Sequence, residues 1–140
     1  MTITITKRLT FCAGHRVLGH ESKCAHMHGH NYAAEITATG NLDTVGRVID
    51  FSEIKRIVGG WIDRYWDHGF LIHMNDHDVE AALLSVPGSK LFVMPDNPTA
   101  ENMASFLLGI CDKLLKDSGI RIKRVRIHET ETCYADAENV

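Results

Sequence analysis

The 140-residue sequence predicts an α+β domain in which a four-stranded antiparallel sheet carries two helices on one face. Apolar residues alternate with period two near both ends of the chain, and two segments between them repeat apolar residues at helical spacing. The expected order is therefore two strands, a helix, an insertion, a second helix and two closing strands. This length supports one hydrophobic core, so residues 1–140 are expected to form a single domain.

The first two strands are expected to form a long hairpin. Residues 2–12 place apolar side chains on one face and threonines on the other, which is typical of a half-buried strand. The apolar set is Ile3, Ile5, Leu9 and Phe11. We expect this strand to end in a turn at residues 13–15. Alternate residues from His28 to Ala38 are histidine or apolar, so the second strand is expected to begin at His28.

A first helix is expected over residues 51–65. Asp50 followed by Glu53 is typical of an N-cap with its capping-box partner. The apolar residues at helical spacing are Phe51, Ile54, Ile57, Val58, Trp61, Ile62 and Tyr65. Gly59 and Gly60 cost about 2 kcal/mol relative to two alanines in a helix interior, so we expect a bend or a close packing contact there.

The segment from residue 73 to residue 97 is expected to be an irregular insertion that contains one short strand-like run at 90–94. Thr99 is then expected to cap a second helix, which Gly119 ends. The predicted buried residues of this helix are Met103, Phe106, Leu107, Ile110, Leu114 and Leu115.

Two closing strands are expected near residues 121–129 and 132–137. The basic run at 121–126 mixes charged with apolar residues, which is typical of a strand with one solvated face. A net charge of −3 without a long basic stretch argues against nucleic acid as the main partner.

The remaining composition predicts a soluble, cytoplasmic protein that is not bound to a membrane. No segment approaches the roughly 18 apolar residues of a membrane span, and the N-terminus lacks the apolar stretch of a signal peptide. The four cysteines are scattered along the chain, at positions 12, 24, 111 and 133. We expect them to be free thiols in a reducing compartment.

Five histidines and two cysteines lie within the first thirty residues, an arrangement typical of a metal site. His28 and His30 lie two positions apart, so a strand places both imidazoles on the same face. His15 is the natural third donor. Histidine nitrogens favour zinc or another late divalent metal, and three protein ligands with one open position are typical of catalytic zinc.

Cys24 has three possible roles on the sequence: a fourth zinc ligand, an inert thiol or a general base. A fourth ligand would complete the tetrahedron of a structural zinc site. Against that role, Cys24 lies in a polar loop four residues before His28, where a thiol can approach a substrate. The histidines at positions 20, 26, 73 and 77 are expected to be solvated loop residues.

Two further candidates carry carboxylates. Glu129 shares a strand face with Val125 and Ile127, so it is either turned to solvent at the strand end or accepts hydrogen bonds from an NH-rich ligand. Asp67 and His68 follow the first helix. Such a pair is more often a helix terminus, but a histidine oriented by a carboxylate can also relay protons to or from a cysteine.

Six motifs, in order along nearly the whole chain, resemble the 6-pyruvoyltetrahydropterin synthase / 6-carboxytetrahydropterin synthase family. They lie at residues 11–16, 24–30, 48–51, 67–68, 97–102 and 128–130. The resemblance implies a tunnelling fold of order ββααββ, in which three subunits join their sheets into a barrel and usually pair into a hexamer. It implies a homo-oligomer with active sites between subunits.

The resemblance also implies a role for each site residue. The metal ligands for Zn²⁺ would be His15, His28 and His30. Cys24 would abstract a proton, with Asp67 and His68 as its relay. Glu129 would anchor the pterin ring and could join the relay, and Thr99 and Glu101 would lie near the substrate.

The implied activity is that of a zinc-dependent lyase acting on a small pterin, 7,8-dihydroneopterin triphosphate. The four-residue step from Cys24 to His28 resembles the bacterial enzymes of the queuosine pathway, which favours 6-carboxy-5,6,7,8-tetrahydropterin as the product. Formation of the pyruvoyl product by triphosphate elimination is the alternative within the family. The alternatives of other classes are a non-catalytic pterin- or metal-binding module and a ring-forming assembly protein, the latter disfavoured by the histidine cluster.

Overall fold

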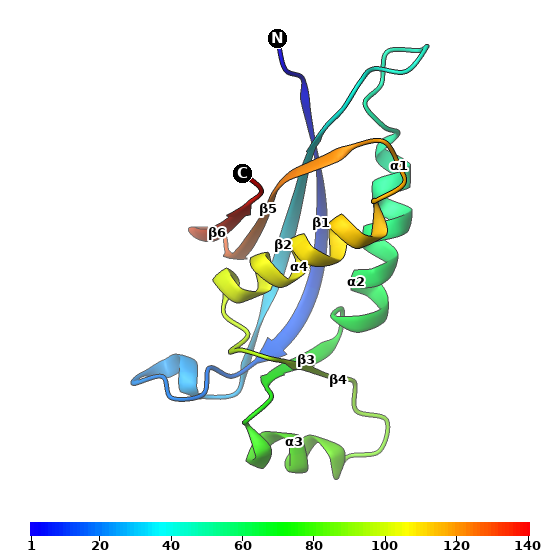
Figure 1. Ribbon diagram of the computed structural model, residues 1–140. Helices are drawn as coiled ribbons and strands as arrows, with labels where there is room; N and C mark the ends of the chain where they lie inside the picture. Colours follow the sequence, from blue (N-terminus) through cyan, green and yellow to red (C-terminus); the bar gives the residue numbers. More distant parts are fainter.

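The computed structural model describes residues 1–140 and forms a six-stranded mixed sheet with helices packed against it (Figure 1). The strands are β1 (Thr4–His15), β2 (His28–Thr39), β3 (Gly69–His73), β4 (Leu91–Met94), β5 (Arg121–Thr130) and β6 (Cys133–Glu138). Their order in the sheet is β4-β3-β1-β2-β5-β6. The helical segments are the short 3₁₀ turn η1 (Lys23–Ala25), α1 (Phe51–Ile54), the π-helical turn η2 (Lys55–Gly59), α2 (Gly60–Tyr65), α3 (His77–Leu84) and α4 (Ala100–Leu114).

The four predicted strands are present as β1, β2, β5 and β6 and pair antiparallel, but the four-stranded description is incomplete. β3 pairs parallel with the end of β1, and β4 pairs parallel with β3. The prediction of an irregular insertion over residues 73–97 was wrong apart from its strand-like run, which is β4. Successive residues Leu71 and Ile72 are both buried, so β3 lacks the alternation that marks a half-buried strand. In α3 only Val79 is buried, which leaves a weak helical pattern.

β1 continues through His15, so the predicted turn at residues 13–15 was also wrong. The last three pairs of the hairpin are Ala13 with His30, Gly14 with Gly29, and His15 with His28. A Cβ added to Gly14 would lie 2.5 Å from the Phe70 ring, and one added to Gly29 would lie 3.0 Å from the Ala13 carbonyl oxygen. The glycine at 14 therefore serves close packing against β3 rather than a turn.

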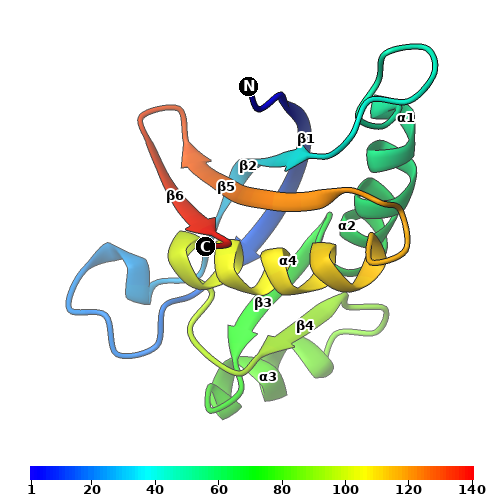
Figure 2. The same ribbon diagram turned by 45° about the horizontal axis from the view of Figure 1, so that its top comes forward.

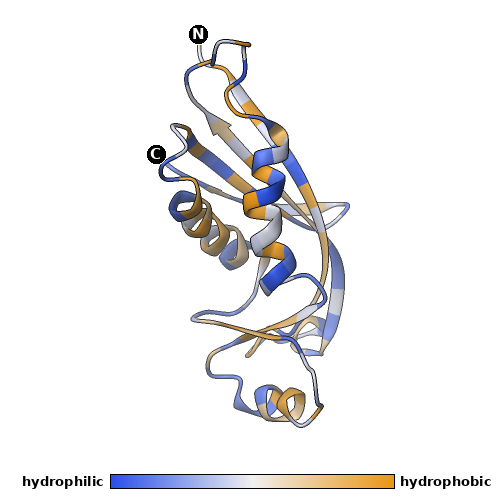
Figure 3. Ribbon diagram, turned by 90° about the vertical axis from the view of Figure 1, so that its right-hand side faces the viewer, coloured by the Kyte–Doolittle hydropathy of each residue, from blue (hydrophilic) through white to orange (hydrophobic).

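Both long helical segments bury their apolar sides against one face of the sheet, as predicted. Figure 2 shows α4 beside β5 and the α1–α2 segment next to it. Along the long strands, hydrophobic and hydrophilic residues alternate in Figure 3. The buried core includes Leu9, Phe11, Ala34, Ile36, Val58, Ile62, Trp66, Met103, Leu107, Val125 and Ile127. None of the helices is long and apolar enough to cross a membrane.

The first helix occupies its predicted span as the continuous segments α1, η2 and α2. The Asp50 carboxylate accepts the Ser52 N–H at 2.9 Å, which confirms the N-cap. The predicted capping-box role of Glu53 was wrong, because its carboxylate pairs with Arg56 at 2.7 Å instead. Gly59 is buried, and a Cβ there would lie 3.5 Å from the Leu9 side chain. The expected close packing contact therefore coincides with the π-helical turn.

The second helix begins where predicted, since the Thr99 hydroxyl accepts the Asn102 N–H at 3.1 Å. One predicted core residue was wrong: the Leu114 side chain is 41% exposed. Ala104 and Cys111 are fully buried in this helix in addition to Met103 and Leu107. The side chains at 104 and 111 are small, so their weak apolar character did not add these positions to the predicted set of buried residues.

We predict that Leu107→Ala lowers the free energy of unfolding by about 2–5 kcal/mol, because it removes a fully buried side chain and leaves a cavity. Leu114→Ala, at the half-exposed position of the same helix, is the matched control and should cost less than about 1 kcal/mol. Urea unfolding followed by tryptophan fluorescence measures both. Equal losses for the two variants would contradict the observed orientation of α4.

Candidate metal centre and its surroundings

Three histidines converge where the β1–β2 hairpin opens into its connecting loop. His15 ends β1 directly opposite His28, the first residue of β2, and His30 follows on the same face. Their donor nitrogens all lie within 4.8 Å of one another. His15 is only 1% exposed, whereas His28 and His30 are half-buried. The structure therefore brings together the three residues that the sequence suggested as metal ligands.

Backbone carbonyls set the tautomers of two of these rings. His15 Nδ1 lies 2.7 Å from the Pro98 carbonyl oxygen, and His28 Nδ1 lies 2.6 Å from the His26 carbonyl oxygen. A carbonyl oxygen can only accept, so each Nδ1 carries the hydrogen and each Nε2 carries a lone pair. A metal-binding histidine usually donates its other ring N–H to such a carbonyl, which fixes the ring and directs the free nitrogen toward the metal.

The free nitrogens point at one another. His15 Nε2 and His28 Nε2 are 3.1 Å apart, an approach of two lone pairs that a cation between them would make favourable. His30 Nε2 is buried without a hydrogen-bond partner. A buried polar atom without a partner costs about 1–3 kcal/mol, and coordination of a metal removes that cost. The donor set of three neutral imidazoles fits zinc with one position left open.

Electrostatics favours the neutral, coordinating form of these rings. Burial lowers the pKa of His15 and that of His30 below the ordinary value for histidine. Glu129 lies beside them, with its Oε1 atom 3.7 Å from His30 Nε2. Its side chain is half-buried at the end of β5 and faces the histidines, so of its two suggested orientations the structure favours the inward one.

The buried Tyr32 lies against two of the three histidines. The sequence did not indicate it as a site residue. Its hydroxyl lies 3.2 Å from His15 Nδ1, and its ring stacks on Phe11 at 5.1 Å. Burial, followed by the charges of Glu129 and Cys24, raises the pKa of the Tyr32 hydroxyl. The tyrosine therefore stays neutral next to the metal ligands.

Cys24 lies in η1, within the loop that joins β1 to β2, and is half-buried. Its sulfur is not among the donor atoms that cluster within 4.8 Å. Its backbone carbonyl accepts the Val17 N–H at 2.8 Å, which closes the base of the loop.

Asp67 and His68 form a pair of their own. His68 Nδ1 lies 2.9 Å from Asp67 Oδ2, and Asp67 Oδ1 accepts the Cys12 N–H at 3.0 Å. Burial acts to raise the pKa of Asp67, but the hydrogen bonds from Cys12 and His68 hold it below its usual value. His68 has a φ of 61° and a side chain that is 79% exposed. The uncommon backbone conformation is held by its N–H, which donates to the Cys12 carbonyl at 2.6 Å.

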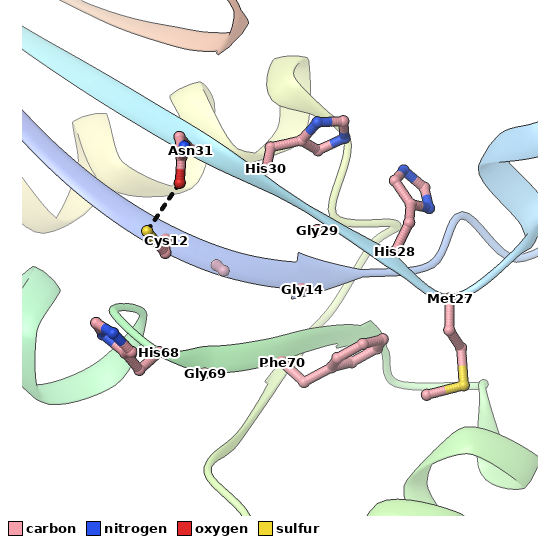
Figure 4. Close-up of a pocket in the computed structure, with 11 residues that line it drawn as sticks. Cys12, Gly14, Met27, His28, Gly29, His30, Asn31, His68, Gly69 and Phe70 are labelled. Carbon is pink, nitrogen blue, oxygen red and sulfur yellow. Dashed lines mark hydrogen bonds between the residues drawn. The ribbon is translucent and has the colours of Figure 1, made fainter.

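The pair does not meet the histidine cluster within one chain. Figure 4 draws His68 across β1 from His28 and His30. No hydrogen bond joins Asp67 or His68 to Cys24 or to the three histidines. His68, His28 and His30 are among the residues that line an open groove of about 580 Å³, together with Gly14 and Gly29.

The remaining predicted site residues lie at the start of α4. The Thr99 hydroxyl is engaged in the helix cap, and Glu101 is exposed in the first turn. The neighbouring Pro98 supplies the carbonyl that orients His15. Sequence reasoning missed that contact because a backbone carbonyl carries no residue signature and the two residues are 83 positions apart.

Comparison with known proteins gives consistent matches over the whole chain. The family model described as 6-pyruvoyl tetrahydropterin synthase matches residues 4–139. A protein of Rickettsia bellii named 6-carboxy-5,6,7,8-tetrahydropterin synthase is 38% identical over 136 residues, which cover 96% of this chain and 99% of the relative. A protein of Haemophilus influenzae with the same name is 34% identical over 138 residues, covering 94% and 96%.

Solved structures share the fold. An uncharacterized protein from Wolinella succinogenes superimposes with a TM-score of 0.85 at 23% identity, covering 100% of this chain and 99% of the other. The 6-pyruvoyl tetrahydropterin synthase of Caenorhabditis elegans gives a TM-score of 0.71 at 22% identity, covering 100% and 97%. At these identities the likeness is one of fold.

We predict that the protein binds one Zn²⁺ per chain and that His30→Ala weakens binding by about 100-fold or more, since loss of even an outer contact costs about 10- to 100-fold. Titration calorimetry on protein freed of metal measures the affinity. His20→Ala and His26→Ala are matched controls from the same loop and should bind zinc as tightly as the unaltered chain does, because His26 contributes only its backbone carbonyl. Unchanged affinity in His30→Ala would refute the three-histidine centre.

We predict that Asp67→Asn lowers the free energy of unfolding at pH 7 by about 1 kcal/mol, because it removes a carboxylate held by two hydrogen bonds. The folded-state pKa of Asp67 is depressed, so its contribution is complete above the unfolded pKa of about 3.9 and is lost as the pH falls through the folded value. Urea unfolding between pH 7 and pH 3 should therefore show the difference from the unaltered chain shrinking below about pH 4. Asp117→Asn, at an exposed position, is the control; a difference that grows on acidification would contradict the assignment.

Proposed function

Since this chain belongs to the 6-pyruvoyl tetrahydropterin synthase family, we propose that it forms 6-carboxy-5,6,7,8-tetrahydropterin from 7,8-dihydroneopterin triphosphate. The observation that carries the proposal is the match to bacterial relatives of that name over almost their full length. The proposed role is a lyase step in the biosynthesis of queuosine-type 7-deazapurines. The geometry of the histidine centre supports a catalytic rather than a purely structural site.

In this proposal, His15, His28 and His30 hold zinc through their Nε2 atoms. Bound zinc supplies Lewis acidity that makes hydrogens on a carbon next to a bound substrate oxygen easier to remove. The protein fixes the three rings in advance, because the Pro98 and His26 carbonyls hold two of them in the coordinating tautomer. Because the rings are fixed in advance, the three histidines would need little rearrangement when zinc binds.

Cys24 is proposed as the base that takes a proton from the substrate side chain. Its absence from the donor cluster supports this role over that of a fourth ligand. A thiol becomes an effective base when nearby positive charge favours the thiolate. Its half-buried position in the loop that joins the two histidine-bearing strands leaves the thiol accessible to a substrate.

Glu129 is proposed to anchor the pterin ring. A carboxylate accepts two parallel N–H groups, the pattern that an aminopyrimidinone edge offers. The position of Glu129 beside His30 would set the ring at a short, fixed distance from the metal. Thr99 and Glu101 are proposed to contact the substrate from the start of α4.

The proton relay of Asp67 and His68 is proposed to act on the Cys24 of a neighbouring copy. Within one chain His68 lies across β1 from His28 and His30, and its exposed imidazole is free to enter a second molecule's site. A homo-oligomer, trimer or hexamer, would bring the two halves together. Strand edges without a partner strand support such an assembly, among them β6 and the part of β1 before its pairing with β3 begins at Ala13.

Charge is complementary along these two edges. Lys7 and Lys55 line a polar groove beside the free part of β1. Glu138 lies on β6 at one end of the sheet, whereas the Asp136 carboxylate on the same strand is already paired with Arg126. Edge-to-edge pairing of sheets between copies would place these opposite charges near one another and would cover both exposed edges.

A second candidate activity within the family is pyruvoyl formation, in which the three-carbon side chain is kept. It is favoured by the description of the matching family model. We predict that mass spectrometry of the products from 7,8-dihydroneopterin triphosphate detects the carboxy product together with acetaldehyde. A pyruvoyl product without acetaldehyde would overturn the preferred activity.

We predict that Cys24→Ala retains zinc and pterin binding and loses about 10²- to 10⁴-fold in kcat, the usual contribution of a general base. Cys133→Ala, which removes an exposed thiol, is the matched control and should keep full activity. Metal analysis, ligand titration and turnover are measured on each variant. Loss of zinc from Cys24→Ala would instead indicate a structural, non-catalytic zinc site.

A further inference from the structure

The loop that carries Cys24 is tied to the rest of the molecule at its first residues. Arg16 donates to the buried Asp76 carboxylate through two hydrogen bonds of 2.8 and 2.7 Å. Two residues later, Leu18 is bound by Asn97, a residue 79 positions away. The backbone of Val17, between these two ties, donates to the Cys24 carbonyl at 2.8 Å. The position of Cys24 therefore depends on the first residues of its loop.

Asn97 forms two hydrogen bonds with the Leu18 backbone, one through each polar atom of its side-chain amide. Its Oδ1 accepts the Leu18 N–H at 2.8 Å, and its Nδ2 donates to the Leu18 carbonyl at 2.9 Å. This two-point contact fixes direction as well as distance. It requires a donor and an acceptor on two separate atoms of one short side chain, which the asparagine amide provides.

The same short segment also holds a metal ligand. Pro98, the next residue, is buried and accepts the hydrogen of His15 Nδ1. The Asn97 carbonyl accepts two hydrogen bonds, one from the Asn102 side chain at 2.9 Å and one from the Thr99 N–H at 2.8 Å. The proline ring restricts the backbone between the two contacts. Residues 97 and 98 thus form a stiff bridge between the Cys24 loop and the histidine centre.

We infer that Asn97 is a positioning residue that sets the Cys24 thiol relative to the metal ligand His15. The inference rests on the proposed role of Cys24 as the base. Asn97 touches neither the three imidazoles nor the thiol, and it acts through Leu18 and Val17 on one side and through the Pro98 backbone on the other. Its loss should therefore impair the proton-transfer step while leaving the metal ligands in place.

The test is Asn97→Ala in the zinc-loaded protein. The Pro98 carbonyl is backbone and persists, so zinc content should stay at one per chain and KM should stay within about twofold. We expect kcat to fall by roughly 10- to 100-fold, the effect of a displacement of about 1 Å at a reacting group. Asn139→Ala is the matched control, because Asn139 also anchors a distant backbone carbonyl, that of Ile122, but lies away from this loop.

A second readout does not depend on turnover. The rate at which iodoacetamide modifies Cys24, read by peptide mass spectrometry, is measured with zinc bound and after its removal. In the unaltered protein and in Asn139→Ala, the rate should change several-fold on zinc removal, because the proposed role of Cys24 places its thiol near the metal. In Asn97→Ala this dependence should vanish. Asn97→Asp keeps the acceptor but loses the donor to Leu18, and it serves as the second variant if the alanine variant does not fold.

Each outcome decides the inference. Unchanged kcat and an unchanged zinc dependence of Cys24 modification in Asn97→Ala would overturn it. Loss of zinc in proportion to activity would also overturn it, since Asn97 would then support the metal centre only. If Cys24→Ala retained turnover, the proposed base would fail, and the modification rates would still show whether Asn97 holds the loop.

Discussion

The register of the β1–β2 hairpin is the constraint on which the site depends. Its last three pairs place His15 opposite His28 and bring His30 onto the same face. A shift of one residue would turn every side chain of one strand to the other face, so the long apolar pattern that buries Leu9 and Phe11 also fixes the imidazoles. The energy that holds the three histidines in place is therefore the packing of the core against both helices.

That register alone would leave a buried imidazole with an unsatisfied nitrogen. His15 is almost fully buried, and its Nδ1 hydrogen requires a partner. The start of α4 supplies it through the Pro98 carbonyl, and the same segment binds the loop after β1 through Asn97. Local hairpin geometry and one long-range contact together define the centre, which explains why residues near both positions 15 and 97 lie in the motifs that resemble the family.

The sequence was informative where a pattern is local. Period-two alternation located β1 and β2, the cap residues Asp50 and Thr99 located both helices, and histidine spacing indicated the metal ligands. Prediction from the sequence failed where the residue pattern is weak or where the contact joins residues far apart in the chain. The parallel strand β3 shows no alternation because both of its faces are buried. Contacts made by backbone carbonyls, such as that of Pro98, leave no trace in residue types, and no spacing could place Asp67 and His68 across β1 from the histidines.

The chain completes its own core, whereas the proposed site requires a second copy. One face of the sheet is filled by helices, and the other carries polar side chains that pair among themselves, as Arg8 does with Glu35 and Arg126 with Asp136. Neither face needs a partner for stability. By contrast, the exposed His68 is oriented by a carboxylate and held in an uncommon backbone conformation, although it reaches no group of its own centre. An uncommon backbone conformation costs free energy, and such conformations cluster at functional sites. In the proposed oligomer, a neighbouring copy would supply the thiol on which Asp67 and His68 act.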